Sequence, residues 1–254
     1  MKQYADSSNL NARIQLYTRF STRSDDFGRW VFDRLVLPGQ TRLLELGCGT
    51  ASLWAGNADR VSAGWDVMLS DMSPGMVREA SCNLTDKGLE FGFSVIDAQA
   101  IPLADSTLDA VVANHMLYHV PDRARAVSEI HRVLRPGGRL FATTIGRGHL
   151  RELRELVERI VPGAFGAGTE VGRFGLENGA VQLAKWFSRV ALHRWRETLE
   201  VTEADALVTY VQSMGRLTAA KMAEFERLCV REIGQHGTMT IRTEVGMFEA
   251  VKEG

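Results

Sequence analysis

The sequence predicts an α/β fold: a mainly parallel β-sheet with helices on both faces. Two observations carry this prediction. Short apolar or β-prone runs alternate with amphipathic helical patterns along the first 145 residues, and such alternation is typical of right-handed βαβ units. In addition, the run Leu43-Leu44-Glu45-Leu46 ends in a glycine-rich turn, which is how a buried strand leads into a ligand-binding loop.

The bulk composition is that of an ordinary globular protein. The chain has 254 residues, of which 45% are apolar and 24% charged. Its net charge of −1 provides no overall field that would attract nucleic acid or an anionic membrane. The sequence has no apolar run near the ~20 residues of a membrane span and no signal-peptide core at its start. We therefore expect a cytoplasmic protein without a membrane span, and nucleic acid is not an expected partner.

The cysteine content argues against a disulfide framework. The three cysteines, Cys48, Cys82 and Cys229, lie far apart and form no Cys-x-x-Cys pair. A structural zinc or iron–sulfur site is therefore not expected either, and a reducing cytosol fits this pattern. No metal site is predicted.

The first 38 residues predict two helices ahead of the sheet. The first spans residues 7–20, where apolar residues recur at helical spacing. The second follows Ser24 and ends at Pro38-Gly39. We expect residues 1–38 to form a helical lid on the main domain.

The main domain is expected over residues 39–254. Its first strands are predicted at residues 41–46, 65–70, 91–96, 108–113 and 139–145. The helices between them are predicted at residues 51–58, 74–82 and 122–134. A turn, Arg135-Pro136-Gly137-Gly138, separates the last of these helices from the strand that follows.

Beyond residue 145 the pattern becomes more helical. A charged amphipathic helix at 150–160 and a glycine-rich loop at 162–179 open an inserted helical cover, expected over residues 150–190. Further helices are predicted at 178–188, 203–214 and 218–234, with a strand near 193–200. The alternating stretch 238–251 predicts an antiparallel hairpin at the sheet edge.

Candidate binding residues follow four successive predicted strands. They are Gly47-Cys48-Gly49, Asp71, Asp97-Ala98 and Asn114-His115-Met116. Open α/β sheets bind ligands at the carboxyl ends of their strands. The glycines let the main chain approach a ligand closely, Asp71 can accept hydrogen bonds from a ribose diol, and Asp97 suits an amine donor.

Each of these features is weak evidence by itself. Asp71 stands before Ser73-Pro74 and could only cap the next helix. Together, the order of a glycine loop, two aspartates and an asparagine at four strand ends favours a nucleoside-binding site over the capping interpretation.

Several motifs resemble those of class I S-adenosylmethionine-dependent methyltransferases. The segments that carry the resemblance lie within residues 40–145: Glu45-Leu46-Gly47-Cys48-Gly49-Thr50, Asp71-Met72-Ser73, Asp97-Ala98 and Arg132-Val133-Leu134-Arg135-Pro136-Gly137-Gly138. They are most similar to the branch of quinone-biosynthesis and natural-product enzymes. The N-terminal segment also resembles a helix that covers the active site in some members. The resemblance implies a Rossmann-like sheet of seven mainly parallel strands with an antiparallel last strand.

The resemblance also implies S-adenosyl-L-methionine as the cofactor. The implied binding residues are Glu45, Gly47, Cys48, Gly49, Asp71, Met72, Asp97, Ala98 and Asn114. The glycines and Asn114 would lie at the methionine portion, Asp71 at the ribose hydroxyls, and Met72, Asp97 and Ala98 at the adenine. The chain departs from the family pattern at Ala51, where a third glycine is usual.

Catalysis by such an enzyme depends more on positioning than on proton removal. Orientation can contribute about 7–11 kcal/mol, whereas a general base contributes about 3–5 kcal/mol. If a base is used, His119 is the first candidate because a histidine titrates near neutral pH, although packing against the next helix is equally plausible. His115 is a second candidate, with packing favoured. Tyr4 and Tyr17 are candidates to close over the cofactor or the acceptor, or they could only anchor the N-terminal helix, which is favoured for Tyr17.

Two groups of residues have a functional and a structural interpretation, and the structural one is favoured for both. Five arginines could form an RNA-binding patch or a charged helix face with its turn: Arg123, Arg125, Arg132, Arg135 and Arg139. Three large aromatic residues could line an acceptor pocket or belong to the core: Trp186, Phe187 and Trp195.

The expected function is methyl transfer from S-adenosylmethionine to a small organic acceptor at oxygen, nitrogen or carbon. A dinucleotide oxidoreductase fits less well because Ser52 replaces the last glycine of G-x-G-x-x-G. A nucleic-acid or protein methyltransferase and a non-catalytic cofactor-binding protein are the alternatives. Amino-directed nucleic-acid enzymes usually carry Asn-Pro-Pro-Tyr where this chain has Asn114-His115-Met116-Leu117. The acceptor and the oligomeric state stay open, although an amphipathic N-terminal helix could be exchanged within a homo-oligomer.

Overall fold

A computed structural model of the chain describes residues 8–85, 87–165 and 170–254. Its contacts divide the chain into two compact units. Unit 1 contains the described residues within 1–24, 147–169 and 196–244. Unit 2 contains residues 25–146, 170–195 and 245–254.

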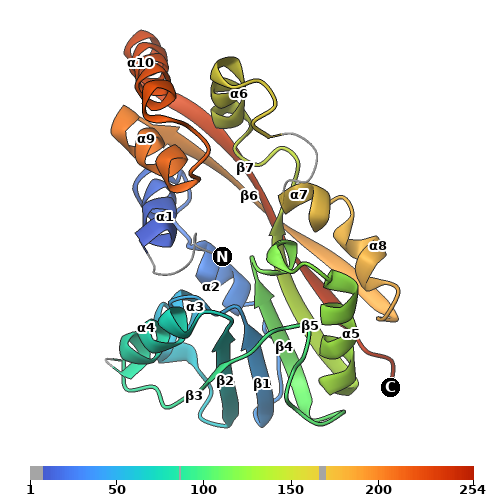
Figure 1. Cartoon of the computed structure of the whole chain (residues 1–254). Helices are drawn as coiled ribbons and strands as arrows, with labels where there is room; N and C mark the ends of the chain where they lie inside the picture. Colours follow the sequence, from blue (N-terminus) through green and yellow to red (C-terminus); the bar gives the residue numbers. More distant parts are fainter. Residues whose placement is uncertain (1–7, 86, 166–169) are drawn as a thin grey trace. The chain divides into compact units, whose positions relative to one another are not determined.

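A seven-stranded sheet with the order β3-β2-β1-β4-β5-β7-β6 is the main feature of the structure (Figure 1). The strands are β1 (Thr41–Leu46), β2 (Trp65–Asp71), β3 (Gly92–Val95), β4 (Leu108–Asn114), β5 (Leu134–Ile145), β6 (Arg189–Val201) and β7 (Met239–Val251). Strands β1 to β5 pair in parallel, and β7 is antiparallel to β5. The predicted α/β fold is therefore confirmed. Strands β6 and β7 contribute residues to both units.

The C-terminal stretch was predicted wrongly in two respects. It forms one strand of 13 residues, β7, and not a hairpin. It also lies between β5 and β6, so that β6 is the edge strand. Met247 and Phe248 are adjacent in β7 and both fully buried, as expected of an interior strand covered on both faces.

The predicted turn at residues 135–138 lies inside β5. Leu108 pairs with Leu134 and Ala110 with Arg139, so the intervening residues leave the ladder. Gly137 takes a left-handed conformation there, with φ of 77°. The turn chemistry was recognised correctly, but the strand resumes on both sides of it.

Unit 2 contains six α-helices in its described residues. They are α2 (Phe27–Phe32), α3 (Ser52–Ala55), α4 (Pro74–Thr85), α5 (Arg123–Val133), α7 (Glu170–Arg173) and α8 (Gly179–Leu183), with 3-10 turns η2 (Ala58–Arg60) and η3 (Leu117–His119). Helix α2 ends six residues before Pro38, and α8 is shorter than predicted. Helix α7 falls in the glycine-rich stretch that was predicted to be a loop.

Alternate residues of β1 pack into two different hydrophobic cores. Leu44 and Leu46 share one core with residues of α5 and α8. Leu43 shares the other with residues of α2, α3 and α4. Helices therefore cover both faces of the parallel sheet, as predicted from the buried strands.

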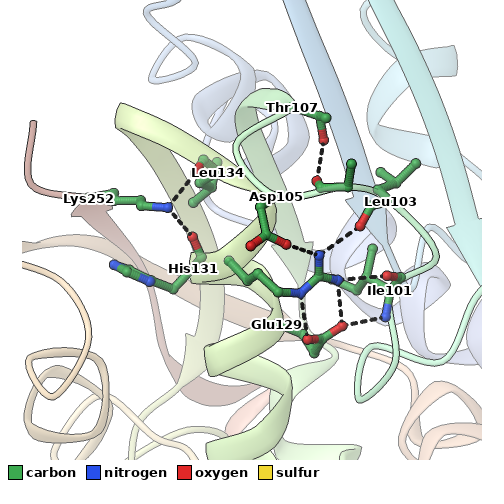
Figure 2. A network of polar contacts seen from close by, with 10 residues as sticks. Ile101, Leu103, Asp105, Thr107, Glu129, His131, Leu134 and Lys252 are labelled. Carbon is green, nitrogen blue, oxygen red and sulfur yellow. Dashed lines mark hydrogen bonds and ion pairs between the residues drawn. The ribbon is translucent and has the colours of Figure 1, made fainter.

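Arg132 links the end of α5 to the segment that precedes β4, where Ile101, Leu103 and Asp105 lie (Figure 2). Its guanidinium donates to the carboxylates of Glu129 and Asp105 and to the carbonyls of Ile101 and Leu103, at 2.7 to 2.9 Å. Glu129 also accepts the N–H of Ile101 at 2.9 Å. The hydrogen bonds from Arg132 lower the pKa of Glu129 and raise that of the guanidinium.

The other four arginines of the predicted charged face also bond within the chain. Arg123 donates to the carbonyl of Val120, Arg125 to that of Gln99, Arg135 to Asp109 and Arg139 to Glu249. These contacts join α5 and β5 to their neighbours, which is the behaviour expected of a structural charged face.

Unit 1 is built from helices that are far apart in the sequence. They are α1 (Ser8–Phe20), α6 (Arg151–Ile160), α9 (Ala204–Ser213) and α10 (Ala219–His236). Their apolar faces meet in one core, to which Leu16 of α1, Leu153 of α6, Leu207 of α9 and Phe225 of α10 contribute. Within the predicted lid, α1 thus belongs to unit 1, whereas α2 belongs to unit 2.

Among the described residues, no helix is both long enough and apolar enough to cross a bilayer. In the same residues, no three His, Cys, Asp or Glu side chains gather in a cluster that could hold a metal ion.

Candidate functional site

The strand order places the four predicted features side by side. Strands β3, β2, β1 and β4 are neighbours and run parallel. Asp97 follows β3, Asp71 ends β2, the Gly47–Gly49 loop follows β1, and Asn114 ends β4. All four therefore lie along one edge of the sheet, at the carboxyl ends where open α/β sheets bind ligands.

The loop after β1 is held tightly against its neighbours. Gly47 and Gly49 have φ angles of 69° and 55°, in the region that favours glycine. A Cβ atom on Gly47 would lie 2.7 Å from the Cβ of Met116, so this loop touches the loop after β4. Cys48 donates its N–H to the carbonyl of Ser70 at 2.8 Å. Burial of the Cys48 side chain raises the pKa of its thiol, so the thiol stays neutral. The groups of this loop that can bind a ligand are therefore those of its backbone.

Ala51 begins α3 in a left-handed conformation, with φ of 59° and ψ of 31°. Its side chain is fully buried. This conformation costs a non-glycine residue about 1–3 kcal/mol. The structure thus gives a physical reason why a glycine is usual at this position.

Asp71 links two backbone segments of the site. Its Oδ2 accepts the N–H of Gly49 at 3.1 Å, and its Oδ1 accepts the N–H of Ser73 at 2.8 Å. The first turn of α4 is capped by Ser73, whose Oγ accepts the N–H of Met76 at 3.4 Å. Asp71 is half-buried, and each of its oxygens keeps lone-pair capacity for an outside donor. Asp71 therefore joins the loop after β1 to the turn before α4, while Ser73 provides the cap of the helix.

Asp97 lies beside an open depression on the same edge. Its carboxylate accepts the backbone N–H of Gln99 at 2.9 Å and the side-chain amide of Gln99 at 3.0 and 3.1 Å. Ala98 is buried, whereas Met72 at the neighbouring strand end is 47% exposed. The depression has a volume of about 290 Å³ and is lined by Asp97, Gln99, Ala100, Asp122 and Arg125. Gln99 was not predicted, although it stands two residues after Asp97.

Glu45 lies behind the site and orients Asn114. Its buried carboxyl accepts the indole N–H of Trp54 at 2.6 Å and the side-chain amide of Asn114 at 2.9 Å. Burial raises the pKa of Glu45 to about 7, against the effect of these two hydrogen bonds. Asn114 also accepts a hydrogen bond from Thr143 Oγ1 at 3.3 Å. Sequence reasoning missed Trp54 and Thr143, because each lies on a different element from Glu45 and Asn114.

The candidate bases have different surroundings. His119 ends η3 with an exposed side chain, and its ring lies edge-on to Tyr118 with centroids 4.5 Å apart. His115 is half-buried, and burial lowers its pKa to about 4, with a smaller contribution from His119. Tyr4 lies outside the described residues.

Tyr17, the other predicted tyrosine, belongs to unit 1. Its hydroxyl lies 3.0 Å from Nε2 of His149. Nδ1 of His149 accepts the backbone N–H of Glu244 at 3.3 Å, so a neutral ring carries its proton on Nε2 and donates it to Tyr17. His149 was not predicted, since nothing near it in the sequence marks it as a partner of Tyr17.

Comparison with known proteins shows which proteins this arrangement resembles. A profile described as a methyltransferase domain matches residues 44–142, which include the four strand ends. The ubiquinone/menaquinone biosynthesis C-methyltransferase UbiE of Bordetella avium is 34% identical over 112 residues, covering 44% of this chain and 43% of that protein. The methyltransferase GfsG of Streptomyces halstedii is 32% identical over 130 residues, covering 50% and 46%. The matches thus span less than half of these relatives.

A solved structure with the same fold contains the cofactor. It is the phosphoethanolamine N-methyltransferase 2 of Haemonchus contortus in complex with S-adenosyl-L-methionine. The two structures superpose with a TM-score of 0.60 at 16% identity, covering 98% of this chain and 58% of that one. The profile match over residues 44–142, together with the fold and the order of the site, makes this chain similar to the class I S-adenosylmethionine-dependent methyltransferases.

Proposed function

We propose that this chain transfers a methyl group from S-adenosylmethionine to a small organic molecule. The observation that carries the proposal is the order of Asp97, Asp71, the Gly47–Gly49 loop and Asn114 along one sheet edge. That order matches the sequence of chemical groups in the cofactor, from adenine through ribose to methionine. The UbiE and GfsG relatives support methylation of a small molecule.

The residues at this edge suit the cofactor. Asp71 and Asp97 are half-buried carboxylates that accept hydrogen bonds from backbone N–H groups and retain further acceptor capacity. An open depression lies beside Asp97, and the exposed Met72 at the neighbouring strand end offers apolar surface for a flat ring. The cofactor supplies a methyl group already activated on a sulfonium.

The chain's contribution is orientation. Asp71 holds the ribose hydroxyls, Asp97 the adenine amine, and the backbone of the Gly47–Gly49 loop the amino-acid portion. Glu45 fixes Asn114 beside that portion, since the Glu45 carboxyl accepts the Asn114 amide directly. Fixed alignment for in-line attack can contribute about 7–11 kcal/mol to lowering the barrier.

Other expectations stay predictions within this proposal. They are the lid over residues 1–38, the cover over 150–190, a general-base role for His119, closure by Tyr4, a homo-oligomer and a cytoplasmic location. None is needed for cofactor binding at the sheet edge.

Cofactor titration of purified protein tests the site. We expect Asp71→Ala to weaken binding of S-adenosylhomocysteine at least tenfold, because hydrogen bonds to a charged group contribute about 1.5–3 kcal/mol each. Asp66→Ala is the matched control: Asp66 lies on the same strand, is exposed, and pairs with Arg42 at 3.2 Å. Equal affinities in the two variants would contradict the assignment.

Incubation of a metabolite extract with the enzyme and methyl-labelled cofactor tests the reaction. Label recovered in small molecules supports the proposal. Label found only in tRNA or protein would favour a macromolecular substrate. Tight cofactor binding without any labelled product would favour a non-catalytic binding protein.

A further inference from the structure

His115 has an unusual backbone conformation at the candidate site. It directly follows β4, and its φ of 49° is left-handed. Its N–H donates to Thr143, to Oγ1 at 3.0 Å and to the carbonyl at 3.3 Å, which fixes this conformation. Non-glycine residues held in such strained conformations cluster at active sites and ligand clamps.

The left-handed turn also changes the direction of the side chain. Successive side chains of a strand point to opposite faces, and Asn114 points toward Glu45, on the face that α2, α3 and α4 cover. The His115 ring lies against Phe27 of α2, with centroids 5.6 Å apart. The turn therefore brings the imidazole to the same face as Asn114.

Aromatic rings surround this imidazole. Tyr118 of η3 lies 6.3 Å from it, centroid to centroid, with the two rings tilted by 56°. Phe27 in turn packs against Trp30 and Trp195 at 5.6 and 5.8 Å. A flat aromatic ligand would find stacking partners here.

The ring nitrogens of His115 are available. Within the described residues, neither nitrogen makes a hydrogen bond, and neither is among the fully buried polar atoms that lack a partner. A half-buried imidazole without a partner inside the protein can bind a polar group of a ligand at little desolvation cost.

The imidazole is neutral at physiological pH. Burial lowers the pKa of His115 to about 4, and the neighbouring His119 contributes in the same direction. The ionisable groups of the adjoining elements are Glu45, which is bonded to Asn114, and Asp26, which caps the helix of Phe27 by accepting the N–H of Arg29. A neutral ring has one nitrogen with a free lone pair, and that nitrogen can accept a hydrogen bond.

We propose that His115 accepts a hydrogen bond from the hydroxyl group of a planar aromatic methyl acceptor. This proposal rests on the proposed function and names a substrate class for it. As the hydroxyl oxygen bonds to the methyl carbon, the carbon–sulfur bond breaks and its electron pair stays on sulfur. The hydroxyl proton passes to the free nitrogen of His115 and then to water. A hydroxyl suits this base because the methylated oxygen becomes strongly acidic, whereas a methylated amine would keep its proton.

A pair of probes tests the hydrogen bond without turnover. 1-Naphthol and 1-methoxynaphthalene have the same ring system, but only the first can donate a hydrogen bond. Calorimetric titration of the wild-type protein, with and without saturating S-adenosylhomocysteine, should show a three- to tenfold preference for 1-naphthol, the effect of about one hydrogen bond.

Variants separate the effect of the His115 ring nitrogen on binding from the effects of the aromatic ring and of the backbone conformation. His115→Asn should keep the preference, because asparagine tolerates a left-handed conformation and its amide oxygen accepts a hydrogen bond. His115→Phe should bind both probes equally. His236→Phe, at the exposed end of α10, is the matched control and should behave as wild type.

The outcomes distinguish this proposal from the proposed function. A preference that survives in His115→Phe, or wild-type protein that binds neither probe or both equally, would overturn the role of His115. Unchanged binding of S-adenosylhomocysteine in these variants would leave the cofactor site in place. Failure of wild-type protein to bind S-adenosylhomocysteine would instead count against the proposed function.

Discussion

Polar side chains at the two ends of the parallel strands have different kinds of partners. At the amino end of β2, Asp66 pairs with Arg42, and at the amino end of β4, Asp109 accepts from Arg135 and from the N–H of Arg42. At the carboxyl ends of the same strands, Asp71 accepts, within the described part of the chain, only from backbone N–H groups, and Asn114 bonds to Glu45 and Thr143.

This difference separates side chains that hold the fold from side chains that can bind a ligand. The charge of an aspartate that is paired with an arginine is balanced within the protein. Asp71 is positioned by two backbone donors, and no arginine or lysine ion pair involving it is found among the described residues. A carboxylate in that state can still accept the hydroxyl groups of a ligand.

The strongest test of this comparison concerns Glu45, the buried carboxyl behind the ligand edge. Its folded-state pKa of about 7 lies above its ordinary value of 4.5. The protonated Glu45 carboxyl therefore contributes its full stabilisation of the fold below pH 4.5, and this contribution is lost as the pH rises through 7. The shift corresponds to about 3 kcal/mol.

Urea denaturation of wild type and Glu45→Gln between pH 4.5 and 8 measures this effect. Wild type should lose up to about 3 kcal/mol of unfolding free energy relative to the glutamine variant across that range. The glutamine keeps the size of the side chain and one acceptor oxygen. Parallel pH profiles of the two proteins would show that the pKa of Glu45 is the same in the folded and the unfolded state, contrary to this account.

The Arg132 network provides the opposite case (Figure 2). Arg132→Met removes hydrogen bonds to Glu129, Asp105 and two carbonyls. We expect a loss of about 1–3 kcal/mol in unfolding free energy, since the side chain is 30% exposed and its ion pairs are screened. The affinity for S-adenosylhomocysteine should change less than threefold.

The pH dependence of this network should also have the opposite sign. Arg132 lowers the pKa of Glu129. The stabilisation of the fold by this pair is therefore present above pH 4.5 and is lost as the pH falls further. An equal loss of stability and cofactor affinity in Arg132→Met would remove the distinction between the two ends of the sheet.

The sequence predicted the arrangement at the carboxyl ends of the parallel strands better than the rest of the molecule. The glycine loop, Asp71, Asp97 and Asn114 each follow directly from a strand, so local patterns locate them and parallel pairing brings them together. Trp54, Thr143 and Phe27 were missed, because their roles depend on which elements pack together. The same limit explains β7, whose alternation predicted β structure but neither a single strand nor its neighbours.

Unit 1 shows this limit most clearly. Its core joins Leu16, Leu153, Leu207 and Phe225, which come from three separate parts of the sequence. Each helix was recognised from its periodicity, but no local signal indicates that these faces share one core. Likewise, the pairing of Tyr17 with His149 joins residues 132 positions apart.

The smallest predicted effect concerns Ala51, where the chain departs from the usual glycine. Ala51→Gly relieves a left-handed conformation worth about 1 kcal/mol or more. It also removes a buried methyl group, at about 0.8 kcal/mol, and gives the unfolded chain more freedom, at about 0.4–1 kcal/mol. Thermal unfolding should therefore show a net change within about 1 kcal/mol, with unchanged affinity for S-adenosylhomocysteine.

Ala51→Val is the contrasting variant and should destabilise strongly, because a β-branched residue fits a left-handed conformation poorly. If valine were tolerated as well as glycine, the backbone at Ala51 would not be left-handed, and the loop would differ from the one that carries the site.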